Sequence, residues 1–316
     1  MEERTNKLKT KNAKQPRNCK PETNFIFNKP YKTGGGAVGA LLYRYGLKHN
    51  LIAAFPADPT SSVIESINGS EVLVFKYPCV NRFPVYNYIS NHIRDYNYTL
   101  FKQFIPKAKF ITMARLPFRQ MESLFYWNYL HISLGLQNFS NPFETFLTNI
   151  NYRKNVDRFV KSFLNQLGHN EIKDLEKRLL AYDKEYDLVM ITEYMEESLL
   201  LLKQMMCWTF DDIVYYSQKI SGRKPQHITS KMEEVLAYKL SNDIRFYDYF
   251  NKTLWHKIHN YNGNFENDLN IFRSKQMRIT ERCSVKQYND EPCDLLRMDV
   301  TNYGRLIREA QFNTFC

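Results

Sequence analysis

Short apolar runs alternate with segments of helical periodicity along the N-terminal part of the chain. Three runs are apolar enough to predict buried β-strands, at residues 25–27, 109–114 and 187–191. Each is followed by a stretch whose apolar residues recur every three or four positions, which predicts helices at residues 37–48, 117–130 and 195–206. Strands separated by helices in this way are typical of a parallel sheet with helices on its faces. The sequence therefore predicts an α/β fold.

The remaining segments extend this prediction. Residues 71–76 form a further β-rich run, whereas residues 84–105 mix aromatic residues with asparagine and are expected to form a helix and a loop. Helices are predicted throughout the C-terminal portion. One of them begins at a capping box, in which Ser230 and Glu233 would each bind an amide of the first turn.

The first 24 residues differ in composition from the rest. They contain seven Lys or Arg against three Glu and no apolar run, which predicts a basic disordered tail rather than a signal peptide or an anchor. No internal repeat or linker divides the remainder of the chain, so residues 25–316 are expected to form one domain. No stretch of about 18 or more apolar residues occurs, so nothing in this sequence is expected to span a membrane by itself.

The charge balance limits the class of ligand. The formal net charge is +11, which favours a nucleic acid, an acidic membrane surface or an anionic small ligand as partner. The sequence contains no zinc-finger spacing, RNP-type motif or basic heptad region. A nucleic acid is therefore not an expected partner.

Cysteines and glycosylation sequons bear on the compartment. None of the six cysteines forms a CxxC pair, so a zinc site is not expected, and Cys283 and Cys293 are near enough in sequence to close a small loop. Four N-x-S/T sequons occur, at Asn68, Asn97, Asn138 and Asn251. An even cysteine count with several sequons favours a secretory lumen. The lack of a targeting segment argues the other way, and both interpretations stay open.

The first predicted strand leads into a loop rich in lysine and glycine. Its residues are Lys29, Lys32, Thr33, Gly34, Gly35 and Gly36. Glycines let consecutive backbone N–H groups converge on an anion, because no Cβ blocks its approach. The helix start behind them adds unpaired N–H groups and the positive end of the helix dipole. We interpret the segment as a phosphate-binding loop; the alternative is an ordinary glycine-rich turn with lysines for solubility.

The order of the loop residues separates it from ATP-binding loops. A Walker A loop places its Lys after the last Gly, followed by a Ser or Thr that binds magnesium. Here Lys32 and Thr33 precede the glycines, and no hydroxyl residue follows them. A kinase is therefore not favoured, and no metal is expected.

A second candidate phosphate site follows residues 109–114. Arg115 leaves the end of this predicted strand, and Ser123 lies two turns into the next helix. An Arg binds phosphate bidentately, and a Ser hydroxyl can add a further hydrogen bond. Because ligands bind at the carboxyl ends of parallel strands, Arg115 and the glycines are expected to face one ligand with two separated phosphates. Alternatively, Arg115 pairs with a carboxylate and Ser123 is an ordinary surface residue.

Three ordered blocks of this sequence resemble the galactose-3-O-sulfotransferase family. They comprise Lys32-Thr33-Gly34, Tyr43-Arg44-Tyr45 and Lys48 to Leu51; then Phe110 to Pro117 and Glu122 to Tyr126; and then Asp187 to Tyr194, Glu197 to Leu202 and Cys207 to Tyr215. The resemblance runs from about residue 25 to 215 and continues more faintly to the C-terminal helix. Three blocks at compatible spacing are more specific than any single motif.

The resemblance implies a P-loop-like fold and a defined reaction. The donor would be 3′-phosphoadenylyl sulfate (PAPS), and the sulfo group would move to the 3-hydroxyl of a terminal galactose on a glycolipid or glycoprotein. By position, the donor-binding residues would be Lys29, Lys32, Thr33, Gly34, Gly35, Gly36, Arg115 and Ser123. Lys32 would neutralise charge at the phosphosulfate, and Arg115 and Ser123 would hold the 3′-phosphate. No metal is implied, because amides and lysine stabilise the leaving group. A Golgi location is also implied, with membrane association only through a family-type anchor that this sequence does not show.

Several positions depart from the family pattern. Gly35 to Ala37 stand where the family has hydroxyl residues, and Leu116 where it tends to have an acidic one. Tyr31 stands where the loop usually carries His, and Asn81 precedes an Arg-Phe pair that usually follows a His. The residues expected at the reacting group are therefore Lys32 and Tyr31.

A general base must have a pKa near the working pH, so Tyr31 could act as one only if its pKa were strongly shifted. Glu193 and His92 are reserve candidates, although a structural role is expected for each. An alternative also stays open, a PAPS-binding pseudoenzyme or scaffold that has lost transfer.

Overall fold

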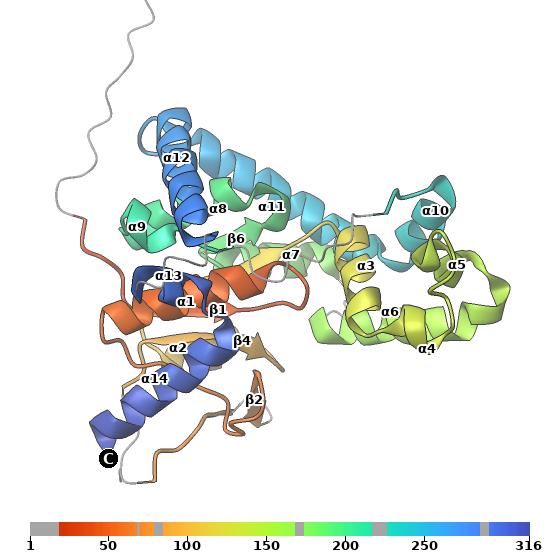
Figure 1. Ribbon diagram of the computed structural model, residues 1–316. Helices are drawn as coiled ribbons and strands as arrows, with labels where there is room; N and C mark the ends of the chain where they lie inside the picture. Colours follow the sequence, from red (N-terminus) through yellow and green to blue (C-terminus); the bar gives the residue numbers. More distant parts are fainter. Residues whose placement is uncertain (1–18, 68–69, 79–84, 168–173, 217–225, 285–290) are drawn as a thin grey trace, which may run out of the picture.

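A six-stranded sheet forms the centre of the protein in the computed structural model (Figure 1). The structure describes residues 19–67, 70–78, 85–167, 174–216, 226–284 and 291–316. The strand order is β3-β2-β4-β1-β5-β6, with strands β1 (Phe25–Asn28), β2 (Val63–Ile67), β3 (Glu71–Leu73), β4 (Tyr88–Ile93), β5 (Lys109–Ala114) and β6 (Leu188–Ile191). Neighbouring strands are parallel, except that β3 runs antiparallel to β2 at the edge. The predicted α/β fold is thus confirmed.

Helices pack on this sheet and form the C-terminal portion, as predicted. They are α1 (Gly35–Lys48), α2 (Tyr98–Phe104), α3 (Pro117–Trp127), α4 (Leu130–Ser133), α5 (Pro142–Thr148), α6 (Arg153–Leu167), α7 (Leu175–Glu185), α8 (Met195–Met206), α9 (Phe210–Ile213), α10 (Ser230–Lys239), α11 (Ser241–His259), α12 (Phe265–Ser284), α13 (Glu291–Arg297) and α14 (Val300–Phe315). Helix α1 packs against β4 and α14, while α8 and α11 pack against β6.

Buried apolar side chains form two clusters. The larger one surrounds the sheet and includes Phe25, Phe27 and Leu42. The smaller one joins α3, α5, α6 and α10 around Phe125 and Phe146. Figure 1 shows these helices, with α4, gathered to one side of the sheet. Because α3 begins directly after β5, the smaller cluster is attached at the carboxyl edge of the sheet.

Strand β4 was not predicted, and it is a central strand. The expectation of a helix and a loop over residues 84–105 is wrong for residues 88–93, which pair with both β1 and β2, and holds only for α2. Ser90 and Asn91 lie buried inside the strand, and the Tyr43 hydroxyl donates a 2.9 Å hydrogen bond to Asn91 Oδ1. Polar residues of low β-propensity thus occupy a central strand with tertiary contacts that satisfy them in part, since Asn91 Nδ2 has no partner among the described residues.

Two predicted helix starts can be checked directly. Pro117 occupies the first turn of α3, as expected, where its missing N–H costs no hydrogen bond. Helix α10 is capped by Thr229 rather than Ser230, because the Thr229 side chain accepts from the amide of Met232. The predicted capping box is therefore wrong, because with Thr229 as N-cap the third helical residue is Met232 and not the Glu or Gln that a capping box needs.

The segment before β1 is held against α8. A disulfide joins Cys19 to Cys207, and Trp208 Nε1 donates to the carbonyl of Glu22 at 3.1 Å. Residues 19–24, which were expected to belong to the tail, are thus attached to the folded domain. Residues 1–18 lie outside the described residues. A second disulfide joins Cys283 and Cys293, which closes the expected small loop. In the described part of the chain, no helix is both long and apolar enough to cross a membrane.

Candidate active site

Residues 29–36, which comprise the loop after β1 and the first two residues of α1, are named the glycine loop. Lys32 and Gly34 have φ values of 61° and 76°, in the left-handed region, and Gly34 precedes the first residue of α1. Alternation of such conformations turns successive N–H groups toward one side, where the first turn of α1 adds its own unpaired amides. Gly36 is exposed, and a Cβ there would have no atom within 4 Å. The chain around Gly36 is therefore open to a ligand.

Two predicted site residues, Thr33 and Lys29, are buried and make contacts that stabilise the glycine loop. The Thr33 hydroxyl is buried and donates to the carbonyl of Pro30 at 3.1 Å, so only its backbone is available to a ligand. The hydroxyl of Thr192 donates to the Thr33 carbonyl at 2.7 Å, which ties the loop to the end of β6. Lys29 is also buried, and its stem passes so close to Gly35 that a Cβ there would lie 2.6 Å from Lys29 Cγ.

One face of α3 is turned toward the glycine loop. Gln120 Nε2 donates to the carbonyl of Tyr31 at 2.7 Å, and Trp127 lies under the ammonium group of Lys32, 4.1 Å from the ring centroid. Ser123 lies three residues after Gln120 and four before Trp127, so it shares their helix face.

Arg115 lies at the same place. Its guanidinium donates to the carbonyl of Lys32 at 2.9 Å. The structure therefore brings Lys32, Arg115 and the Ser123 face of α3 to one side of the glycine loop, as the sequence predicted.

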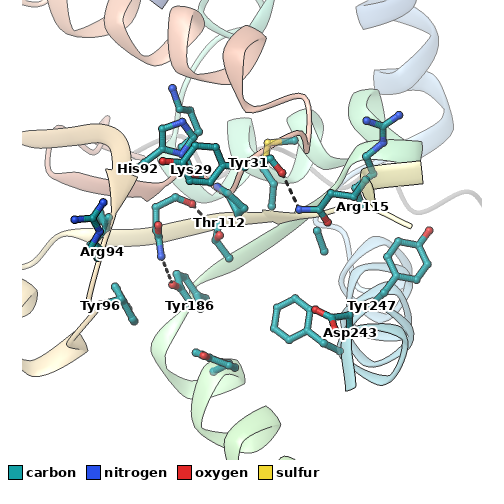
Figure 2. A pocket seen from close by; sticks show the side chains of 18 of the residues that line it. Lys29, Tyr31, His92, Arg94, Tyr96, Thr112, Arg115, Tyr186, Asp243 and Tyr247 are labelled. Atoms are coloured by element: carbon teal, nitrogen blue, oxygen red, sulfur yellow. Dashed lines mark hydrogen bonds between the residues drawn. The ribbon is translucent and has the colours of Figure 1, made fainter. Parts of the chain in front are cut away.

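A cavity of about 520 Å³ opens beside the loop, at the carboxyl ends of β1, β4 and β5. Of the predicted site residues, Lys29, Tyr31 and Arg115 line it, together with the reserve candidate His92. Figure 2 shows these side chains on its upper side, with Asp243 and Tyr247 of α11 further down. The predicted residues that lie outside its lining are Lys32, Thr33, Gly34, Gly35, Gly36 and Ser123.

His92, at the end of β4, is held in a single orientation. Its ring stacks on that of Tyr31 at 3.8 Å between centroids, and its Nδ1 lies at hydrogen-bond distance from the carbonyl of Lys29. A carbonyl can only accept, so Nδ1 carries the proton and Nε2 keeps its lone pair. Burial, assisted by the charge of Lys29, lowers the pKa of His92 to about 3, so the ring is neutral at physiological pH.

The other two base candidates have less suitable surroundings. Burial raises the pKa of the Tyr31 phenol, so it stays protonated at neutral pH. Glu193 accepts hydrogen bonds from the amide of Leu116 at 3.1 Å and from the hydroxyl of Tyr247 at 3.3 Å. Those bonds join β6 to the segment after β5 and to α11, which is a structural role. Asn81 lies outside the described residues.

The sequence resembles known proteins along most of its length. The family model for galactose-3-O-sulfotransferase matches residues 2–294. The chain belongs to the galactose-3-O-sulfotransferase family. Mouse relatives include galactosylceramide sulfotransferase, 27% identical over 76% of this chain and 59% of its own length. Galactose-3-O-sulfotransferase 2 is 27% identical over 76% and 64%, and galactose-3-O-sulfotransferase 3 is 28% identical over 84% and 63%. The chain thus spans about three fifths of the length of the curated relatives it matches.

One residue of the cavity, Asp243, was not predicted from the sequence. Asp243, in the first turn of α11, lines the cavity and is only 5% exposed. Neither carboxylate oxygen receives a hydrogen bond from another described residue. Burial raises the pKa of this carboxyl to about 7. No motif surrounds Asp243 in the sequence, and only the packing of α11 against β6 reveals it.

Proposed function

We propose that the protein transfers a sulfo group from PAPS to the 3-hydroxyl of a terminal galactose on a glycolipid or glycan. The observation that carries this proposal is the glycine loop, which presents amides, Lys32 and Arg115 beside a cavity that contains a neutral histidine. Membership of the family and the printed names of the relatives support the same reaction class.

The glycine loop suits the 5′-phosphosulfate of the donor. Its amides and the start of α1 bind negative charge, and the space above Gly36 is open. Lys32 needs only to leave the ring of Trp127 to reach an anion at the loop. Arg115 and Ser123 would hold the 3′-phosphate, whose presence distinguishes this donor from ATP.

His92 is our candidate for the general base, because its Nε2 is unprotonated. Its pKa of about 3 in the chain without donor is too low for a base at neutral pH, and the negative charge of a bound donor would raise it. The S–O bond to the 5′-phosphate breaks while a new S–O bond to the sugar oxygen forms, and the hydroxyl proton passes to Nε2 of His92. The charge left on the 5′-phosphate faces the loop amides and Lys32. With His92 as base, Tyr31 serves to stack on the imidazole and orient it.

The pseudoenzyme alternative has the weaker support. It rests on the absence of a histidine at residue 31 and before Arg82, and His92 offers a neutral imidazole in the cavity without either of them.

We propose the Golgi lumen as the site of action. Disulfides such as Cys19–Cys207 persist in oxidising compartments. Of the described sequons, only Asn138 is exposed in a turn, whereas Asn97 caps α2 and the side-chain oxygen of Asn251 is buried. In a secretory host, we therefore expect one glycan at Asn138 among these three. Asn138→Gln should abolish the glycosidase-sensitive gel shift contributed by this site, and an unglycosylated wild-type chain would contradict the proposal.

Calorimetric titration with adenosine 3′,5′-bisphosphate tests the donor site, with ADP as the control. Tight binding of the bisphosphate and weak binding of ADP are expected. Preference for ADP, or binding of neither by folded protein, would refute the donor assignment. Transfer of radiolabelled sulfo groups from PAPS to a galactoside then tests catalysis directly.

A further inference from the structure

We infer that the cavity beside the glycine loop is the subsite for the terminal galactose, and that the carboxylate of Asp243 accepts a hydrogen bond from one of its hydroxyl groups. The inference rests on the proposed function for the identity of the sugar. It goes beyond that function because it names the surface that recognises the acceptor and the residue that anchors it.

Asp243 is a polar group without a protein partner. Its side chain is 95% buried, yet neither oxygen receives a hydrogen bond from another described residue. Burying a carboxylate without a hydrogen-bond partner costs free energy. A fold retains such a group only where something compensates for this cost. A ligand hydroxyl donating into the cavity supplies the missing hydrogen bond. Figure 2 shows the Asp243 carboxylate on the α11 side of the cavity, across from Tyr96 and Arg94.

Four cationic residues line the cavity, of which Lys29 is buried beside the glycine loop and the three arginines have contacts within the protein. Arg94 pairs with Glu65, Arg115 donates to the carbonyl of Lys32, and Arg178 lies over the ring of Tyr182 at 4.1 Å. An anionic ligand would also meet the Asp243 carboxyl, whose ionised form is already disfavoured by burial and would be disfavoured further beside another negative charge. The lower part of the cavity therefore suits a neutral ligand that offers hydrogen-bond donors, which describes a sugar better than a phosphate.

The remaining wall presents aromatic rings. Tyr186 accepts a hydrogen bond from Asn28 Nδ2 at 3.1 Å, and the Tyr247 hydroxyl is bound to Glu193. Because these hydroxyls are engaged elsewhere, the two residues offer mainly their apolar surfaces to a ligand. A volume of about 520 Å³ is within the usual size of small-ligand pockets, roughly 300 to 1,000 Å³. It accommodates a terminal sugar with part of the next unit.

The position of the cavity fits the transfer reaction. Tyr31 and His92 line the same cavity as Asp243, so a sugar held by Asp243 shares the cavity with the proposed base. The glycine loop amides are immediately beyond Tyr31. An acceptor in the cavity and a donor on the loop would therefore occupy adjoining sites without overlapping.

The test compares Asp243→Asn with Asp248→Asn. Asp248 lies on the same helix but is exposed, so it receives the same chemical change outside the cavity. NMR titration with methyl β-galactoside, at saturating adenosine 3′,5′-bisphosphate, gives the sugar affinity of each protein, and calorimetry gives the bisphosphate affinity. We expect Asp243→Asn to weaken galactoside binding at least tenfold, to leave the bisphosphate affinity within twofold, and Asp248→Asn to change neither.

Unchanged galactoside affinity in Asp243→Asn would overturn the inference, as would no galactoside binding by the wild-type protein. A parallel loss of bisphosphate affinity would also overturn it and assign the cavity to the donor. Asp243-dependent galactoside binding by a chain that ignores the bisphosphate would support the sugar subsite while refuting the proposed reaction.

A series of monodeoxy methyl β-galactosides keeps the inference testable on the wild-type chain even if Asp243→Asn does not fold. At least one of them should bind ten times more weakly than the parent sugar. Equal affinity across the series would remove the case for a hydroxyl anchor.

Discussion

The glycine loop and the Asp243 wall of the cavity adjoin each other, yet they are built in opposite ways. The loop is eight consecutive residues that present backbone amides and a lysine, and it favours negative charge. The wall combines residues from β1, β4, β5, α7 and α11, and its polar groups without a hydrogen-bond partner among the described residues include the Asp243 carboxyl and the Tyr96 hydroxyl. For the proposed reaction, this difference favours the anionic donor at the loop, where amides and Lys32 attract phosphate, and an uncharged sugar at the wall.

The largest expected effect concerns the stability of the wall. The folded protein keeps the Asp243 proton up to about pH 7, whereas an unfolded aspartate loses it near pH 3.8. Between these values the folded state binds more protons, so the free energy of unfolding falls as the pH rises. At about 1.4 kcal/mol per pKa unit, the full loss is on the order of 4 kcal/mol.

Urea unfolding of the wild type and of Asp243→Asn at pH 5 and pH 8 measures the part of this loss that falls between these pH values, about 2 pKa units or roughly 2.7 kcal/mol. The variant should lack this loss. Relative to the wild type, Asp243→Asn should therefore have a higher free energy of unfolding at pH 8 than at pH 5. Asp248→Asn should follow the wild type. Parallel pH profiles for the wild type and Asp243→Asn would mean that the carboxyl is not buried as described.

The next prediction tests His92, which lies between the glycine loop and the Asp243 wall, as the general base. His92→Asn keeps a side-chain donor for the carbonyl of Lys29 but removes the proton acceptor at Nε2. Sulfo transfer should fall by at least about 100-fold, the usual contribution of a general base. The affinities for bisphosphate and galactoside should change little. His259→Asn, an exposed change on α11, is the control, and transfer above a tenth of the wild-type rate in His92→Asn would exclude the base assignment.

A smaller effect is expected on the loop side. Lys32→Ala or Arg115→Ala should weaken binding of adenosine 3′,5′-bisphosphate at least about tenfold, or 1.4 kcal/mol. Galactoside binding should persist in Lys32→Ala, because Lys32 does not line the cavity. The exposed Lys154 offers a matched lysine, and Lys154→Ala should bind as the wild type does. Wild-type bisphosphate affinity in both loop variants would disprove the donor site.

The smallest effect separates two nearby glycines. Gly34 has a φ of 76°, and a Cβ there would lie 3.3 Å from Met195 Cε, so Gly34→Ala should destabilise the protein by about 1–2 kcal/mol. Gly36 has open space around it, and Gly36→Ala in the first turn of α1 should be neutral or stabilising by up to about 1 kcal/mol. Thermal unfolding of the two variants measures the contrast, and equal destabilisation would contradict the loop conformation.

The loop could be predicted from the sequence because its determinants are local. Glycines, a preceding strand and a following helix occur within one short segment, and Arg115 follows a strand whose apolar pattern is plain. The structure places Arg115 against Lys32, as that reasoning expected. The contacts of these residues with a donor stay a prediction.

The wall could not be predicted, because it depends on tertiary structure. Strand β4 contains Ser90, Asn91 and His92, which are residue types typical of loops. The contact that accommodates Asn91 in the strand comes from Tyr43, which is distant in sequence. Without β4, nothing in the sequence placed His92 at the carboxyl edge of the sheet. Asp243 lies in a helix that is far from β4 in sequence, so no local pattern connects them.

The contact between Lys32 and Trp127 gives this protein an intrinsic optical probe. Trp127 is 55% exposed at the mouth of the donor site, whereas Trp208 is buried against Tyr45 and Trp255 lies on α11. An ammonium group above an indole perturbs its excited state, so the emission of Trp127 depends on where Lys32 lies. When an anion draws Lys32 away, the change in fluorescence reports donor binding in real time without any label.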